Sequence, residues 1–314
     1  MAVLCAYLSV VLLWATTPLA VQWSSDGVGF AMAVVLRMAL ALALALCVSA
    51  IFRRSLFSHA GAWKVYLAAS IGIFPNMPLV YWSAQFIPSG LIALIFAMSP
   101  FITGLMSLII LRENPFNLRR MLALLLALGG LVVIFHDQLQ IDIQAAYGML
   151  GMVGSSILFS TSSVWLKSLK SDVPAFDQAT GSLLLSMPGL LLVCWFSDDG
   201  LPVEISIKSA AAIVYLAVCG SLLGFTLFFY VLKKLSPSAV SLITLMTPVL
   251  AMMIGVLVAD EHITIAMMIG GSLVLLALVV YVDWSFGHWF EKALRRPSIE
   301  GSSLELKEQV IRYK

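Results

Sequence analysis

Long runs of apolar residues dominate the chain, and short stretches marked by Gly, Pro, Ser or charge separate them. An α-helix needs about 20 mainly apolar residues to cross the hydrocarbon core of a bilayer. Ten runs approach or exceed that length, at residues 3–22, 28–52, 63–85, 88–111, 117–136, 144–167, 174–196, 208–231, 237–258 and 264–283. The pattern therefore predicts an all-α integral membrane protein with ten transmembrane helices.

The last stretch, residues 284–314, breaks this pattern. It begins with an aromatic group, Trp284, Phe286, Trp289 and Phe290, and is then rich in charged residues. Aromatic side chains gather at membrane–water interfaces. We therefore expect an interfacial anchor followed by a polar tail.

The composition supports a location inside a bilayer. Hydrophobic residues make up 61% of the chain and charged residues 11%, against about 45–50% and about 25% in soluble domains. These values exclude a cytosolic enzyme, a secreted disulfide scaffold, a disordered chain and a nucleic-acid-binding domain. The expected partners are membrane lipid and a small-molecule substrate, with no nucleic acid, in a monomer or weak oligomer.

Basic residues test both the number of helices and their orientation, because cytoplasmic loops carry an excess of Lys and Arg. With a cytoplasmic N-terminus, sixteen of the eighteen basic residues fall in cytoplasmic loops and the tail. The two exceptions are Lys208, in an outer loop, and Arg37, within a helix. The distribution predicts a multi-pass membrane protein with both termini in the cytoplasm.

Two stretches of the chain repeat a pattern at a constant offset of 148 positions. Ile95–Pro100 is followed by Glu113, and Ile243–Pro248 by Glu261, each thirteen residues after the proline. Gly72 and Gly220 match at the same offset. Residues 1–136 and 144–283 are therefore predicted to be two five-helix repeats. Since five is odd, the copies face opposite ways, as in secondary transporters that bind substrate near the midplane.

These features resemble the drug/metabolite transporter superfamily, specifically the EamA-type bacterial permeases. The matching pieces are Trp14 in the first helix, Arg37 in the second, and the proline–Glu units ending at Glu113 and Glu261. A Gly usually precedes each Glu in that family, whereas Arg112 and Asp260 stand there in this chain. The resemblance implies ten helices around a central cavity, alternating access and export of small metabolites.

Arg37 is the charged residue that lies inside a predicted helix, away from both of its ends. Ionisable residues inside a membrane are functional hypotheses by default. Two interpretations remain open. The guanidinium is either a counter-charge for a carboxylate or phosphate of the substrate, or a structural group that neighbouring helices satisfy.

The positions of the carboxylates indicate whether a buried proton relay is present. Glu113, Asp177, Asp260 and Glu261 lie at helix ends, and no Asp, Glu or His occupies the middle third of a predicted helix. Proton-driven pumps usually keep a titratable group in the membrane interior. The sequence therefore argues against a buried carboxylate relay and leaves facilitated diffusion, exchange, or coupling through another group, for which Asp177 is the best placed.

Polar, aromatic and methionine side chains at intermediate depth are the predicted substrate-binding residues. With Arg37 they are Trp14, Asn76, Tyr81, Met98, Ser155, Ser160, Trp165, Gln178, Tyr230, Thr244 and Met246. A buried amide must be hydrogen-bonded, so Asn76 binds either a neighbouring helix or a ligand. Tyr81 and Tyr230 have an alternative role in an interfacial aromatic belt. Ser and Thr also serve close helix packing, and Met serves general packing.

Pro100 and Pro248, at matching positions of the two repeats, are predicted hinges. Each proline removes a backbone hydrogen bond and can kink its helix. The carbonyls freed in this way belong to residues 96 and 244, and we expect them to face the cavity. The alternative is a static bend, which membrane helices tolerate.

The sequence contains no paired carboxylates, metal-ligand cluster, nucleophile–His arrangement or nucleotide-binding fingerprint. We therefore expect no enzyme activity, no cofactor and no metal site. The favoured function is a secondary transporter, an exporter, of small amphipathic metabolites such as amino acids. The alternatives are a membrane-embedded transferase, which would need clustered acids or an intramembrane nucleophile, and a non-transporting sensor or channel.

Overall fold

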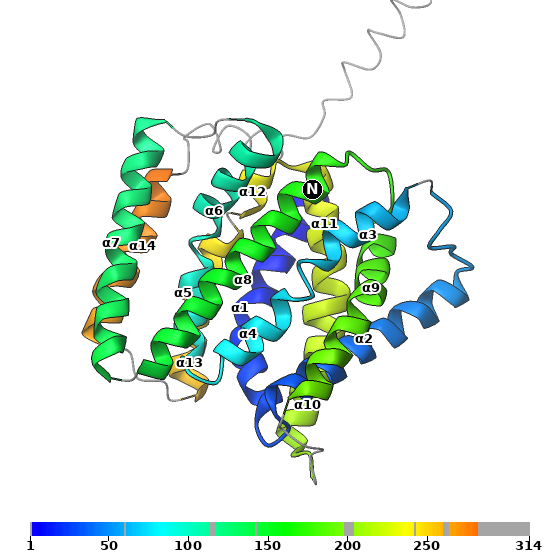
Figure 1. Ribbon diagram of the computed structural model, residues 1–314, viewed down its shortest axis with the longest axis horizontal. Coiled ribbons are helices and arrows are strands. Elements are labelled where there is room, and N and C mark those ends of the chain that lie inside the picture. Colours follow the sequence, from blue (N-terminus) through cyan, green and yellow to red (C-terminus); the bar gives the residue numbers. More distant parts are fainter. Residues whose placement is uncertain are drawn as a thin grey trace, which may run out of the picture.

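The computed structural model describes residues 2–59, 61–113, 117–141, 143–197, 204–241, 243–259 and 264–281 (Figure 1). Within these ranges all regular secondary structure is helical. The predicted all-α class is confirmed for this part of the chain. The predicted tail, residues 284–314, lies outside the described residues.

Some of the predicted helices are continuous. Apolar side chains along their whole length favour uninterrupted helices, because each backbone group is satisfied within the helix itself. The continuous helices are α1 (Ala2–Ser25), α2 (Phe30–Ile51), α7 (Leu118–Ile141), α8 (Ile143–Ser168), α9 (Ala175–Phe196) and α14 (Ile265–Tyr281).

Three other predicted helices are interrupted. A turn at residues 71–75 divides one of them, and π-helical segments (η1 and η2) occupy parts of the two others. The pieces are α3 (Ala62–Ser70) and α4 (Asn76–Ser83); α5 (Ser89–Phe96), α6 (Ser99–Met106) and η1 (Ser107–Leu111); α10 (Ile207–Tyr215), η2 (Leu216–Leu223) and α11 (Gly224–Lys234). The predicted helix at 237–258 corresponds to α12 (Pro237–Ser241) and α13 (Ile243–Ala259), on either side of residue 242, which lies outside the described residues.

Six helical segments of the described chain are long and apolar enough to cross a membrane. They are Ala2–Ser25, Phe30–Ile51, Ser89–Leu111, Ile143–Ser168, Ala175–Phe196 and Ile207–Lys234. The other four predicted segments also coincide with helix in the described residues, but they are interrupted, shorter, or more polar at their ends.

The long helix α1 lies at the centre of the bundle, in contact with α5, α10, α11 and α13 (Figure 1). Its buried face carries small and β-branched residues such as Val10, Val21 and Ala15. Small side chains let helices approach closely in a membrane, where the lipid itself supplies no apolar contrast. The central place of α1 puts the middle of this helix beside any cavity of the bundle.

Helices α7 and α14 pack chiefly against each other at one edge of the bundle (Figure 1). They cross at Gly130 and Gly270, where a Cβ atom on either glycine would lie 2.5 Å from the carbonyl oxygen of the other. The crossing therefore requires glycine on both helices.

Contacts at the two ends of the bundle come from different loops. At one end, Lys167 of α8 reaches the carbonyls at the end of α11, and Tyr7 of α1 donates to the carbonyl of Ala239. At the other end, Gln22 donates to the carbonyl of Ile87 and Ser209 to that of Asp26. The lysine-rich loops thus gather at the end that holds the N-terminus.

Candidate functional site: a central cavity with one arginine

A cavity with an empty volume of about 690 Å³, open solvent included, lies between the helices and is bordered by α1, α2, α4, α5, α8, η2, α11 and α13. Its walls are mainly apolar, with contributions from Val21, Met77 and Ile92. Ligand sites typically combine apolar walls with a few fixed polar groups. Here the polar groups are Arg37, Thr17, Thr244 and Thr247, together with the indole of Trp14.

The guanidinium of Arg37 is buried, with 1% of the residue exposed. Its Nε donates to Ser221 Oγ at 2.8 Å and its Nη1 to the hydroxyl of Tyr81 at 3.4 Å. Gly220 leaves room for the guanidinium, since a Cβ there would lie 3.1 Å from Nη2. Among the described residues no carboxylate forms an ion pair with Arg37. The cavity therefore carries a net positive group.

Aromatic rings cover one side of the cavity. Trp14 contacts Phe159 edge-on, with ring centroids 5.6 Å apart, and packs against Phe228 at 5.0 Å. Phe159 also contacts Phe96 and Phe228, at 6.0 and 5.2 Å. These rings come from α1, α5, α8 and α11, so the cluster holds four helices together and presents a broad apolar surface to a ligand.

Three of the predicted substrate-binding residues, Trp14, Arg37 and Thr244, line the central cavity. Tyr81 is fully buried and adjoins the cavity through its hydrogen bonds with Arg37 and Ser24. This burial rules out the alternative role of Tyr81 in an interfacial belt. Tyr230 and Gln178 line a separate cavity at one end of the bundle.

Asn76 and Ser155 bind each other within the protein. Ser155 Oγ donates to Asn76 Oδ1, and Asn76 Nδ2 donates to the carbonyl of Gly72 at 2.9 Å. Both residues are fully buried. Of the two interpretations for Asn76, the bond to a neighbouring helix is the one observed, joining α4 to α8.

The remaining predicted residues have other surroundings. Ser160 accepts a hydrogen bond from Thr103, and Met98 is buried in the turn between α5 and α6. Trp165 packs, partly buried, against the core. The side chain of Met246 lies outside the described residues.

The two predicted hinges differ in their settings. Pro100 lies in the first turn of α6, after the interruption at residues 97–98, whereas Pro248 lies inside the continuous helix α13. A hydroxyl on the preceding residue satisfies a nearby carbonyl in both cases. Ser99 donates to the carbonyl of Phe96, and Thr247 donates to that of Thr244 at 3.2 Å. The backbone carbonyls of Phe96 and Thr244, which we expected to face the cavity, therefore accept hydrogen bonds from side chains.

Several residues of the site were not identified from the sequence. They are Phe159, Phe225 and Thr247, which line the cavity, and Ser221, which accepts from Arg37. Phenylalanine in an apolar run cannot be separated from ordinary core by its pattern alone. Ser221 did carry a signal, because it follows Gly220, which matches Gly72 at the repeat offset.

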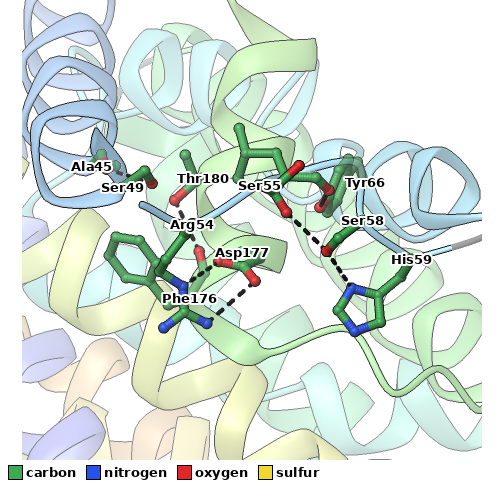
Figure 2. A network of polar contacts seen from close by, with 11 residues as sticks. Ala45, Ser49, Arg54, Ser55, Ser58, His59, Tyr66, Phe176, Asp177 and Thr180 are labelled. Atoms are coloured by element: carbon green, nitrogen blue, oxygen red, sulfur yellow. Dashed lines mark hydrogen bonds and ion pairs between the residues drawn. The ribbon is translucent and has the colours of Figure 1, made fainter. Parts of the chain in front are cut away.

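An ion pair lies at the lysine-rich end of the bundle (Figure 2). Arg54, in the connection between α2 and α3, donates from Nε and Nη2 to the two oxygens of Asp177, at 2.9 and 3.3 Å. The guanidinium also lies over the ring of Phe176, 5.5 Å from its centroid. This contact joins the α2–α3 connection to the first turn of α9.

The described residues offer little for metal or covalent chemistry. Within those ranges, no group of three or more His, Cys, Asp or Glu side chains is placed to hold a metal ion. What the arrangement provides is a partly open apolar space with one cation and a set of hydroxyls, which suits binding of a solute.

Comparison with known proteins assigns the class. The model of the EamA-like transporter family matches residues 1–136 and again residues 146–282. Together these segments cover nearly all of the chain. The chain belongs to the EamA-like transporter family, within the drug/metabolite transporter superfamily.

The individual relatives are distant in sequence, but each match extends over most of the chain. Protein PecM of Dickeya dadantii (strain 3937) is 24% identical over 231 residues, covering 71% of this chain and 74% of the relative. The uncharacterized transporter YoaV of Bacillus subtilis (strain 168) is 23% identical over 275 residues, covering 87% of this chain and 94% of the relative. A solved crystal structure has the same fold, with a TM-score of 0.67 at 18% identity, over 90% of this chain and 98% of that one.

Proposed function

We propose that this transporter exports small amphipathic metabolites, with amino acids as the leading class, through the central cavity. The observation that carries the proposal is Arg37, a buried cation with no carboxylate partner among the described residues, on the wall of an otherwise apolar space. An anionic group of the solute supplies the missing counter-charge, because an isolated charge in a low-dielectric site is costly. The aromatic wall contacts the apolar part of the solute.

The alternating-access cycle rests on the two-repeat organisation, residues 1–136 and 144–283 in opposite orientations. Two features support it. The turn at residues 71–75 and the π-helical segment η2 interrupt the helices that carry Gly72 and Gly220, the positions matched at the repeat offset. Both segments lie close to the cavity. Irregular backbone at membrane depth is tolerated where it is buried in protein or lines a cavity.

Transport in liposomes tests this function. Purified protein is reconstituted, and uptake and efflux of a panel of amino acids and uncharged analogues are measured with and without a proton gradient. We expect transport of solutes that carry a carboxylate and an apolar body, and little transport of the uncharged analogues. Absence of transport across the whole panel would contradict the proposed substrate class, and transport that follows the gradient would show proton coupling.

We propose that the protein lies in the bacterial inner membrane with both termini in the cytoplasm. Single cysteines placed at Lys170 and Lys208, in a variant without native cysteines, test the orientation through labelling by an impermeant maleimide. Position 208 is expected to react in intact cells, and position 170 only after the membrane is opened. Labelling of both positions from one side would contradict a membrane crossing by α9 and with it the proposed orientation.

A further inference from the structure

A second cavity opens at the lysine-rich end of the bundle, with an empty volume of about 1230 Å³ that includes open solvent. It lies between the α8–α9 connection, the start of α9 and the end of α11. Four lysines line it, Lys167, Lys170, Lys233 and Lys234, against one carboxylate, Asp172. The cavity therefore has a strong excess of positive charge. The function proposed above makes no use of it.

Two of these lysines hold the walls together. Lys167 Nζ donates to the carbonyls of Leu232 and Leu235, at 2.8 and 2.7 Å, and Lys233 Nζ donates to the carbonyl of Val173 at 2.8 Å. The bonds tie the end of α11 to α8 and to the residues before α9. The carbonyls at the end of α11 offset part of the charge of Lys167. Among the described residues, no carboxylate forms an ion pair with either lysine.

The other two lysines are available to a ligand. The ammonium groups of Lys170 and Lys234 form no hydrogen bond or ion pair with the described residues, and both side chains are exposed. The cavity also holds a buried acceptor. Gln178 is 1% exposed and donates from Nε2 to the carbonyl of Val173, while its Oε1 has no partner among the described residues. An unmet buried acceptor of this kind calls for a donor on a ligand or a water.

Shared residues connect this cavity with the central one. A small intermediate cavity lies between them, and Phe159 and Phe225 line both it and the central cavity. Phe229 lines both the intermediate cavity and the lysine-lined cavity. Phe228 fills the space between, with its centroid 5.2 Å from that of Phe159 and 5.6 Å from that of Phe229. Aromatic rings thus separate the central cavity from the lysine-lined one.

We propose that the lysine-lined cavity is an oxyanion-binding site, which receives the carboxylate or phosphate of a small solute that also carries an O–H or N–H donor. The lysines attract the oxyanion, and Gln178 Oε1 accepts the donor. In the transport cycle this site would be a first anion subsite, which the solute reaches before Arg37. That role rests on the proposed function. Oxyanion binding itself does not depend on transport.

An anionic lipid headgroup offers the same chemistry at this depth. Lysines near the cytoplasmic surface of a membrane attract anionic lipids at about 1 kcal/mol per residue. The experiment therefore separates the two sources of the oxyanion by changing the lipid composition.

The test measures binding of inorganic phosphate by calorimetry to the full chain in phosphatidylcholine nanodiscs. Phosphate at neutral pH has both charged oxygens and an O–H donor. We compare the native chain with the double variant Lys170→Gln/Lys234→Gln. The matched control is Lys64→Gln, which removes a lysine near the same end that does not line the cavity. The double variant should lose about thirtyfold in affinity, because two charges at about 1 kcal/mol each make about 2 kcal/mol, and 1.4 kcal/mol corresponds to tenfold.

The proposal is overturned if the native chain binds no phosphate at millimolar concentration, or if the double variant and Lys64→Gln bind equally. Repeating the titration with phosphatidylglycerol in the nanodiscs identifies the source. Strong competition by this lipid assigns the site to headgroups, and unchanged phosphate binding assigns it to a solute. In the second case, the double variant should raise KM for transport from the cytoplasmic side without changing kcat. Failure of transport alone would count against the proposed function and leave the binding result standing.

Discussion

Arg37 of α2 and Ser221 of η2 lie 184 positions apart in the sequence, yet the guanidinium Nε donates to the serine hydroxyl at 2.8 Å. The bond joins a continuous helix from the first half of the chain to an irregular one from the second. It also fixes the direction of the guanidinium, because Tyr81 accepts from Nη1 of the same group. A cation held in this way is pre-organised for an anion.

The first prediction concerns that cation. Arg37→Gln should raise KM for carboxylate-bearing solutes roughly 10- to 100-fold, since a hydrogen bond to a charged group contributes about 1.5–3 kcal/mol. Ser221→Ala keeps the charge and should have a smaller effect. Flux measurements in liposomes, with an uncharged analogue beside each acid, check this. If Arg37→Gln weakens transport of the analogue equally, the arginine serves structure and not recognition.

The second prediction concerns the ion pair between Arg54 and Asp177. The side chain of Arg54 is 38% exposed and that of Asp177 5%. Arg54→Gln therefore strands a buried carboxylate, whereas Asp177→Asn leaves an arginine that water can solvate. We expect Arg54→Gln to lower the free energy of unfolding by about 1–3 kcal/mol and Asp177→Asn by less. Chemical unfolding in detergent measures both, and the reverse order would contradict this account.

The third prediction uses neighbouring glycines of α7. A Cβ at Gly130 would lie 2.5 Å from the carbonyl oxygen of Gly270, whereas a Cβ at Gly129 would meet nothing within 4 Å. Gly130→Ala should destabilise the protein by about 1–3 kcal/mol, because backbone blocks the added methyl. Gly129→Ala, the matched control, should stay within about 0.5 kcal/mol of the native chain. Equal thermal stability of the two variants would show that α7 and α14 do not cross at these glycines.

The fourth prediction separates structure from binding at Asn76 and Ser155. Each single alanine variant leaves a buried polar group without its partner and should cost about 1–3 kcal/mol. The double variant should cost less than the sum of the two, because it removes both members of one hydrogen bond. KM for transport should remain unchanged throughout, and a selective rise in KM for Asn76→Ala would restore this residue to the substrate site.

Hydropathy was enough to predict where helices form in this chain, since a bilayer allows few other structures. It could not predict where they are interrupted. Pro75 precedes the start of α4 and Pro100 lies in the first turn of α6, so those interruptions had a local signal. The π-helical segment at Leu216–Leu223 contains no proline, and its Ser221 accepts a hydrogen bond from Arg37 of a distant helix, which no local pattern predicts.

The substrate site could also be predicted only in part, because contacts between distant parts of the chain leave no local pattern. Residues of unusual type for a membrane helix, Trp14 and Arg37, were recognisable on their own and do line the cavity. The partner of Asn76 lies 79 positions away, and no local pattern connects the two. The lysines of the second cavity were interpreted only through their effect on orientation, because their convergence depends on how α8, α9 and α11 end in space.

The crossing of α7 with α14 has a consequence for biosynthesis. Residues 118–141 leave the ribosome long before residues 265–281, so the Gly130 face of α7 lacks its α14 partner until α14 is translated. Chains halted before residue 265 would hold that face against lipid or against the insertion machinery. We therefore expect maturation of the first half to depend on α14, and nascent chains truncated ahead of it should be preferred targets of membrane quality-control proteases.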